Sequence, residues 1–182
     1  MTTRSGARLT VPVSERDHIR GPAQALVTVV EYGDYECPYC GAAYPVVEEL
    51  RRQFANRLQF VFRHFPLAQS HPHAQEAAEA AEAASAQDRF WEMHDTLYTH
   101  QRALDETHLI RYATALGLDP TAFCEALSDH SFEERVRHDF MSGVRSGVNG
   151  TPSFFVEGVR YDGPYDFESL SAAIEEVAAE KG

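Results

Sequence analysis

The feature that most constrains the fold is a pair of cysteines between a strand-like run and a helix-like run. The run ALVTVVEY, residues 25–32, is continuous and β-branched, which is typical of a strand buried on both faces. Cys37 and Cys40 follow, and residues 38–54 carry apolar side chains at helical spacing. A second strand-like run, LQFVFRHF, occupies residues 58–65. The pattern predicts a β-α-β unit whose strands are parallel.

The rest of the chain divides into a helical middle and a β-β-α end. Residues 67–147 are rich in alanine and glutamate and predict four or five helices. Residues 152–164 predict two short strands joined at Glu157–Gly158, and an amphipathic helix follows at residues 166–180. RLTVPV, residues 8–13, predicts a short edge strand, because Pro12 cannot donate to a central ladder.

Composition excludes some classes of partner. The chain has 182 residues and a formal charge of −12, which argues against nucleic acid or an anionic membrane surface as the main partner. The first 24 residues contain no apolar signal, and no run is long enough to cross a membrane. We therefore expect a cytoplasmic protein without membrane insertion. Three cysteines, of which only two lie close together, fit that expectation better than a disulfide scaffold.

Three chemistries are open to the cysteine pair. A zinc site needs further cysteines or histidines at metal spacing, and Cys124 stands alone, so zinc is disfavoured and we expect no metal. A structural disulfide closing so small a loop removes little chain entropy from the unfolded state. A redox pair has a positive mechanism, because cysteines at i and i+3 lie on one helix face and can form a disulfide.

The position of the pair favours redox chemistry. At a helix N-terminus, Cys37 is surrounded by unsatisfied N–H groups and the positive end of the helix dipole, both of which stabilise a thiolate. Pro38 suits the first helical turn because it has no N–H to leave unpaired. Cys40, one turn further, is expected to stay protonated until it attacks Cys37 in a mixed disulfide.

Four stretches carry a family resemblance: EYGDYECPYC, FRHFPL, FWEMHDTLY and GVNGTPSFFVEG. They resemble bacterial DsbA-like proteins of the thioredoxin superfamily, in which a helical domain is inserted into a thioredoxin fold. The resemblance implies an α/β thioredoxin fold around a mixed sheet. Residues 15–66 and 148–182 would form the thioredoxin-like domain and residues 67–147 the inserted helical domain. Residues 1–14 would be an N-terminal extension or edge strand.

The resemblance also implies roles for residues at the motif. Cys37 would be the nucleophile and Cys40 the resolving thiol of a protein disulfide oxidoreductase, with their disulfide as the redox group and no other cofactor. Thr151–Pro152 matches the loop whose cis-proline faces the cysteines and presents backbone to substrate by β-augmentation. Pro38 and Tyr39 would shape the site. The partners implied are protein or small-molecule thiols and disulfides, together with a recycling thiol or reductase.

Glu31 matches a buried acid of the superfamily, six residues before the nucleophile. It shares strand parity with Val27 and Val29, so burial would raise its pKa and let it accept the proton of Cys40. The alternative is a glutamate near a strand end that reaches water.

Other polar residues near the motif receive simpler interpretations. Asp34 and Glu36 oppose a thiolate if close, but we expect them to be exposed and screened. His71 and His73 flank Pro72 at a predicted helix start, where a capping or loop role is expected. Cys124 is expected to be a small core residue. Tyr39 stands where typical DsbA proteins carry histidine, so one source of oxidising character is absent and we expect an intermediate reduction potential.

Two alternative functions remain open. The first is a glutathione-S-transferase-kappa-like or isomerase enzyme on the same scaffold, which the retention of both Cys37 and Cys40 disfavours. The second is a redox-sensing or peptide-binding module in which the thiol pair controls an interaction.

Overall fold

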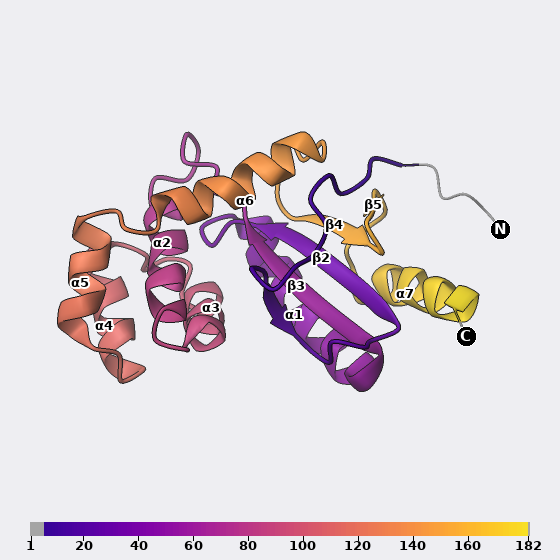
Figure 1. Ribbon diagram of the computed structural model, residues 1–182, viewed down its shortest axis with the longest axis horizontal. Helices are drawn as coiled ribbons and strands as arrows, with labels where there is room; N and C mark the ends of the chain where they lie inside the picture. Colours follow the sequence, from indigo (N-terminus) through magenta and orange to yellow (C-terminus); the bar gives the residue numbers. More distant parts are fainter. Residues whose placement is uncertain (1–5, 182) are drawn as a thin grey trace. The chain divides into compact units, whose positions relative to one another are not determined.

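The computed structural model describes residues 6–181. Its central feature there is a five-stranded sheet with the strand order β1-β3-β2-β4-β5. In chain order the strands are β1 (His18–Arg20), β2 (Val27–Gly33), β3 (Leu58–His64), β4 (Ser153–Val156) and β5 (Val159–Tyr161). Figure 1 shows β2 and β3 as the two long neighbouring strands.

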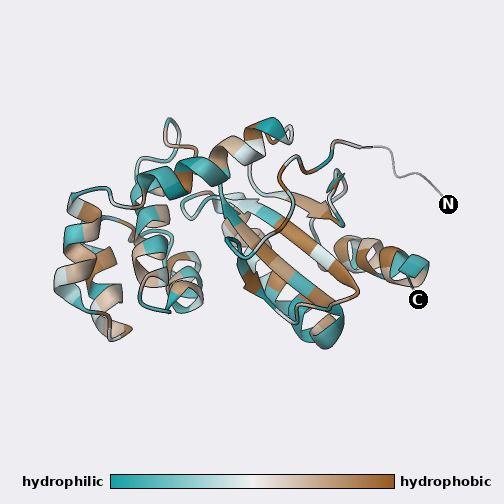
Figure 2. Ribbon diagram, viewed as in Figure 1, coloured by the Kyte–Doolittle hydropathy of each residue, from teal (hydrophilic) through white to brown (hydrophobic). Residues whose placement is uncertain are grey.

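The predicted β-α-β unit is present. Helix α1 (Pro38–Phe54) connects β2 to β3 with Pro45 in its interior, and a short 3₁₀ turn, η1 (Ala55–Arg57), follows it. Every residue of β3 is buried, and so is every residue of β2 except Thr28. Figure 2 shows hydrophobic colour along both strands, as expected for strands covered on two faces. The buried apolar side chains of α1 are Ala43, Val47, Leu50 and Phe54.

The predicted β-β-α end is also present. Strands β4 and β5 are antiparallel and join at Glu157 and Gly158, whose φ angles are 50° and 73°. Two successive left-handed residues are what a tight hairpin turn requires. The Glu157 carboxylate accepts the N–H of Thr28 at 2.6 Å, which ties the turn to β2. Helix α7 (Phe167–Lys181) then packs against β2 and β4 through an apolar face that includes Leu170 and Ile174.

The N-terminal strand prediction is wrong in position. Residues 8–13 form no strand; Arg8 makes one isolated bridge to Val159, and the edge strand beside β3 is β1. Arg63 of β3 explains part of the difference, because its guanidinium donates to the carbonyls of Val11 and Pro12 at 2.9 and 3.1 Å. These carbonyls bond a buried side chain in place of a neighbouring strand. Residues 1–5 of the predicted extension lie outside the described residues.

Five helices separate β3 from β4, which agrees with the predicted four or five. They are α2 (Ala74–Ser85), α3 (Phe90–Thr99), α4 (Glu106–Ala115), α5 (Pro120–Ser128) and α6 (Glu133–Arg145). Alanines line the buried face of α2 and allow close approach of α3 and α5. Asp119 caps α5 by accepting the N–H of Ala122 at 3.0 Å, with Pro120 in the first turn.

The described chain forms two compact units. The sheet unit contains the residues up to Gly33, Ala42–Arg63 and those from Ser142 onward. The helical unit contains Asp34–Gly41 and His64–Met141. The segment that carries the two cysteines therefore belongs to the helical unit.

Candidate active site

Cys37 and Cys40 lie at the start of α1, where the sequence places them. Cys37 directly precedes Pro38, the first helical residue, and its N–H donates to the Asp34 carbonyl at 3.2 Å. The carbonyl of Cys37 accepts the N–H of Gly41 at 3.0 Å, which closes the first helical turn around Cys40. Cys37 is 3% exposed and Cys40 is fully buried. This geometry gives Cys37 the N-terminal environment that favours thiolate.

The two residues between the cysteines are exposed. Pro38 lies at the surface, and Tyr39 is 63% exposed, which makes it an exception among the large hydrophobic side chains of the described residues. An aromatic ring held in water beside a buried thiol offers apolar contact area to an approaching chain.

Asp34 organises the turn that leads into Cys37. Its carboxylate is buried and accepts three hydrogen bonds: from the N–H of Glu36 at 2.8 Å, from the N–H of Leu67 at 2.8 Å, and from Nδ1 of His71 at 2.7 Å. The expectation that Asp34 is exposed and screened is therefore wrong. The physical reason is that two peptide groups and an imidazole replace the water that a lone carboxylate would need.

A second set of bonds fixes the loop that carries His71. The carbonyl of Leu67 accepts the N–H groups of Ser70 and His71 at 2.8 and 2.9 Å, which folds this loop into a compact turn. The N–H of His73 donates to the Glu36 carboxylate at 2.6 Å. The loop between β3 and α2 is thus joined at two points to the segment before Cys37.

His71 is a titratable side chain that is joined to this segment through Asp34. Burial alone would lower the pKa of His71, but the hydrogen bond and negative charge of Asp34, with the negative charges of Cys37 and Glu36, raise it above its ordinary value. The imidazole is mostly buried, with 19% of its side chain exposed. For His71 and His73 the sequence predicts only a capping or loop role. Helix α2 does begin nearby, at Ala74, but its N-cap residue His73 makes no side-chain capping bond.

Gln101 clamps the backbone around Cys37. Its Nε2 donates to the carbonyl of Tyr35 at 2.9 Å and to that of Cys37 at 2.8 Å. Gly41 makes this contact possible, because a Cβ at that position would lie 1.9 Å from Oε1 of Gln101. Nothing in the local sequence indicates this role, since Gln101 lies more than sixty residues from the cysteines it positions.

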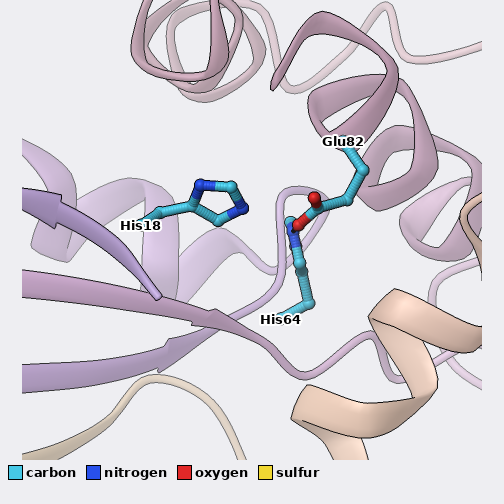
Figure 3. Close-up of side chains that lie close together, drawn as sticks. All are labelled: His18, His64 and Glu82. Atoms are coloured by element: carbon cyan, nitrogen blue, oxygen red, sulfur yellow. Dashed lines mark hydrogen bonds and ion pairs between the residues drawn. The ribbon is translucent and has the colours of Figure 1, made fainter. Parts of the chain in front are cut away.

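A buried polar network lies behind Tyr35. The Tyr35 hydroxyl is hydrogen bonded to Nδ1 of His94 at 3.0 Å, and its ring packs edge-on against His64. His64 donates from Nε2 to the Glu82 carboxylate at 2.8 Å, as Figure 3 shows, and its N–H bonds Asp139 at 3.1 Å.

Three predicted site residues belong to the sheet unit: Glu31, Thr151 and Pro152. Glu31 is 3% exposed and pairs with Phe154 in the β2–β4 register, so the alternative of a glutamate reaching water is wrong. The Thr151–Pro152 peptide bond is cis. The catalytic role of Glu31 and the substrate contact of Thr151–Pro152 stay predictions.

Cys124 is separate from the motif. It lies half-buried in α5, beside the buried Phe123 and one turn before Leu127, as a free cysteine. The expectation of a small packed residue holds in part, since the side chain keeps some exposure.

The fold and the motif define a class of protein: a thioredoxin fold with a helical insertion and a cysteine pair at the start of its first long helix. The chain belongs to the thioredoxin family, since the family model described as Thioredoxin matches residues 13–176. Solved structures share the predicted fold, the thioredoxin fold with a helical insertion. Alpha-DsbA1 from Wolbachia pipientis has a TM-score of 0.82 at 19% identity, covering 95% of this chain and 96% of that one.

Two further relatives are more similar in sequence, one a solved structure and one a curated protein sequence. A thioredoxin-like oxidoreductase from Silicibacter pomeroyi has a TM-score of 0.80 at 28% identity, covering 93% of this chain and 95% of its own. A Na(+)/H(+) antiporter NhaA 3 from Salinispora tropica is 53% identical over 167 residues, 91% of this chain. That match covers 26% of the antiporter, so the chain spans about a quarter of the length of this curated relative.

These relatives contradict the cytoplasmic prediction. Proteins 43–53% identical to this chain are named as sodium–proton antiporters, which are membrane proteins. The prediction rested on the lack of an apolar leader, and such a lack within this stretch does not determine location. Among residues 6–181, no helix has both the length and the apolar character that crossing a membrane requires.

Proposed function

We propose that the chain is a DsbA-like thiol–disulfide oxidoreductase whose redox group is the Cys37–Cys40 pair. The observation that carries the proposal is the position of Cys37 at the N-terminus of α1, with Cys40 one turn further, in a thioredoxin fold. The Silicibacter relative, named as an oxidoreductase, supports it. Protein or small-molecule thiols and disulfides are the substrates proposed.

The proposed exchange proceeds through a mixed disulfide. The Cys37 thiolate attacks one sulfur of a substrate disulfide, an S–S bond forms, and the other substrate sulfur leaves as a thiolate that takes up a proton. Cys40 then loses its proton and attacks the sulfur of Cys37, which closes the Cys37–Cys40 disulfide and releases the second substrate thiol. Two electrons pass to the substrate, and a recycling thiol or reductase returns them. The same steps in reverse oxidise a substrate dithiol.

The roles of three further residues follow from the resemblance. Glu31 is proposed to accept the proton of Cys40 as that thiol attacks, because a buried carboxylate is a suitable base for a buried thiol. Thr151 and Pro152 are proposed to present backbone to an extended substrate.

Trapping the mixed disulfide tests the proposal. In the Cys40→Ala, Cys124→Ser variant the resolving step is blocked, so a substrate disulfide should remain attached to Cys37. Mass spectrometry should find one covalent adduct, absent in the matched Cys37→Ala, Cys124→Ser variant. An equal yield of adduct on Cys40 in that control would contradict Cys37 as the nucleophile.

A second candidate function is favoured by the antiporter relatives. Because this chain matches about a quarter of proteins named as antiporters, a redox-sensing module attached to a transporter is an alternative role for the same pair. Sustained catalytic reduction of a protein disulfide, with a supplied reductant, favours the enzyme. Stoichiometric oxidation without turnover, accompanied by redox-dependent binding of one partner, favours the sensor.

A further inference from the structure

His71 has no role in the exchange as described so far. Its hydrogen-bond partner, Asp34, also bonds the backbone N–H of Cys37. Asp34 binds the imidazole through its side chain at 2.7 Å and the Cys37 N–H through its carbonyl at 3.2 Å. One residue therefore joins the histidine to the backbone of the nucleophile. The turn at Leu67 and the bond between the His73 N–H and Glu36 hold the loop from its other side.

The cysteine motif itself offers no cation. Its two central residues are Pro38 and Tyr39, and neither carries a positive charge at neutral pH. The nearby acidic residues Asp34 and Glu36 would oppose a thiolate if nothing balanced them. The hydrogen bond between Asp34 and His71 places a titratable imidazole in this acidic setting.

We propose that His71, oriented by Asp34, is the cation that stabilises the Cys37 thiolate, in place of a histidine within the motif. This assignment rests on the proposed oxidoreductase function, since it concerns the ionisation of the same nucleophile. Asp34 is a positioning residue that fixes the ring through Nδ1 and leaves Nε2 as the second N–H of the imidazolium.

The electrostatics of the loop agree with this geometry. Negative charge on Cys37 is among the influences that raise the pKa of His71, together with Asp34 and Glu36. These three groups, all on the segment leading into α1, are charges that raise the pKa of the imidazole. Such an interaction is reciprocal. The Cys37 thiolate raises the pKa of His71, and the protonated His71 lowers the pKa of the Cys37 thiol by the same free energy.

The redox consequence follows from the half-reaction. The Cys37–Cys40 disulfide takes up two electrons and one proton to give a Cys37 thiolate and a Cys40 thiol. His71 interacts with the thiolate charge, which exists only in the reduced form. The imidazolium therefore stabilises the reduced form and makes the protein more oxidising than its Tyr39-containing motif indicates.

The first test measures ionisation of the Cys37 thiol directly. In a Cys40→Ser, Cys124→Ser background Cys37 is the only cysteine, and its rate of alkylation by iodoacetamide follows the thiolate fraction as pH varies. We compare this background with added His71→Gln or His71→Lys. The matched control is His108→Gln, which removes an imidazole bonded to Asp105 at 2.6 Å at the start of α4.

His71→Gln should shift the alkylation profile to higher pH by about one unit, a tenfold lower rate on the acidic limb. The rates should converge at high pH, where the thiol is ionised in every variant. His71→Lys should recover part of the shift, and His108→Gln should leave the profile in place. A rate lowered equally at all pH values would show a structural role only, and an unchanged profile would overturn the assignment.

The second test needs no change at the site. NMR titration of the histidines in the Cys124→Ser protein should give His71 a higher pKa in the reduced than in the oxidised form, with His108 unaffected by redox state. Equal His71 pKa values in the two forms would overturn the inference while leaving the exchange function intact. Failure to form the Cys37–Cys40 disulfide at all would instead remove the proposed function.

Discussion

Two aspartate–histidine pairs in the helical unit have nearly the same bond and different surroundings. Nδ1 of His71 lies 2.7 Å from the Asp34 carboxylate, and Nδ1 of His108 lies 2.6 Å from that of Asp105. The Asp34 side chain is fully buried, whereas that of Asp105 is 47% exposed. Bond length therefore does not distinguish the two pairs.

What surrounds each carboxylate does distinguish them. Asp105 is the N-cap of α4, and its hydrogen bonds from His108 lower its pKa. Asp34 also accepts two backbone N–H groups from separate segments, and its histidine interacts with the charge of a cysteine. The comparison indicates that burial and a third charged partner convert a common capping pair into a candidate part of an active site.

The largest expected difference is in stability. Asp34→Ala leaves the N–H groups of Glu36 and Leu67 without their acceptor, at a cost of about 1–3 kcal/mol each when buried. We expect the free energy of unfolding to fall by about 2–6 kcal/mol in total. Asp105→Ala removes an exposed cap and should cost much less. Urea denaturation measures both, and equal losses would contradict the comparison.

Gln101 gives the Cys37 segment a further support. Gly41→Ala should displace the Gln101 amide and break both of its bonds to the segment, at about 0.5–1.5 kcal/mol each. In the Gly41→Ala, Gln101→Ala double variant the two losses should be less than additive, because they remove the same contacts. Strict additivity in urea denaturation would show that Gly41 and Gln101 act independently.

The two pairs should respond to pH in opposite directions. The pKa of His71 is raised, so its stabilising contribution is complete below the pKa of an unfolded histidine and is lost as pH rises through the raised value. The pKa of Asp105 is lowered, so its contribution is present above the pKa of an unfolded aspartate and is lost as pH falls through the lowered value.

Denaturation midpoints of the native protein, His71→Gln and Asp105→Asn across pH measure these contributions. The difference between the native protein and His71→Gln should shrink toward alkaline pH. The difference for Asp105→Asn should shrink toward acid. If the difference in midpoint between the native protein and His71→Gln instead grew with rising pH, the raised pKa of His71 would be wrong.

The smallest effect is expected at His108. His108→Gln should leave the rate of thiol–disulfide exchange unchanged, because its imidazole serves an exposed helix cap. Turnover of a small disulfide measures this, and a loss comparable to that of His71→Gln would remove the distinction between the two pairs.

The sequence predicts the parts of this fold that depend on periodicity. Residues 25–65 give β2, α1 and β3 because β-branched runs and helical spacing are local patterns, and the placement of Cys37 at a helix start follows from them. The edge strand fails because its residues contact Arg63, a long-range partner. The roles of Asp34, His71 and Gln101 likewise cannot be predicted from the local sequence, because they depend on contacts across 33–66 residues.

The most direct test of the account is the equilibrium between the Cys37–Cys40 pair and graded glutathione buffers, in the Cys124→Ser background. We predict one reversible two-electron couple that is lost in Cys37→Ser. Its potential should lie between about −270 mV, the thioredoxin region, and about −120 mV, the strongly oxidising region. The absence of any reversible couple would contradict the proposed function and leave the pair without a redox role.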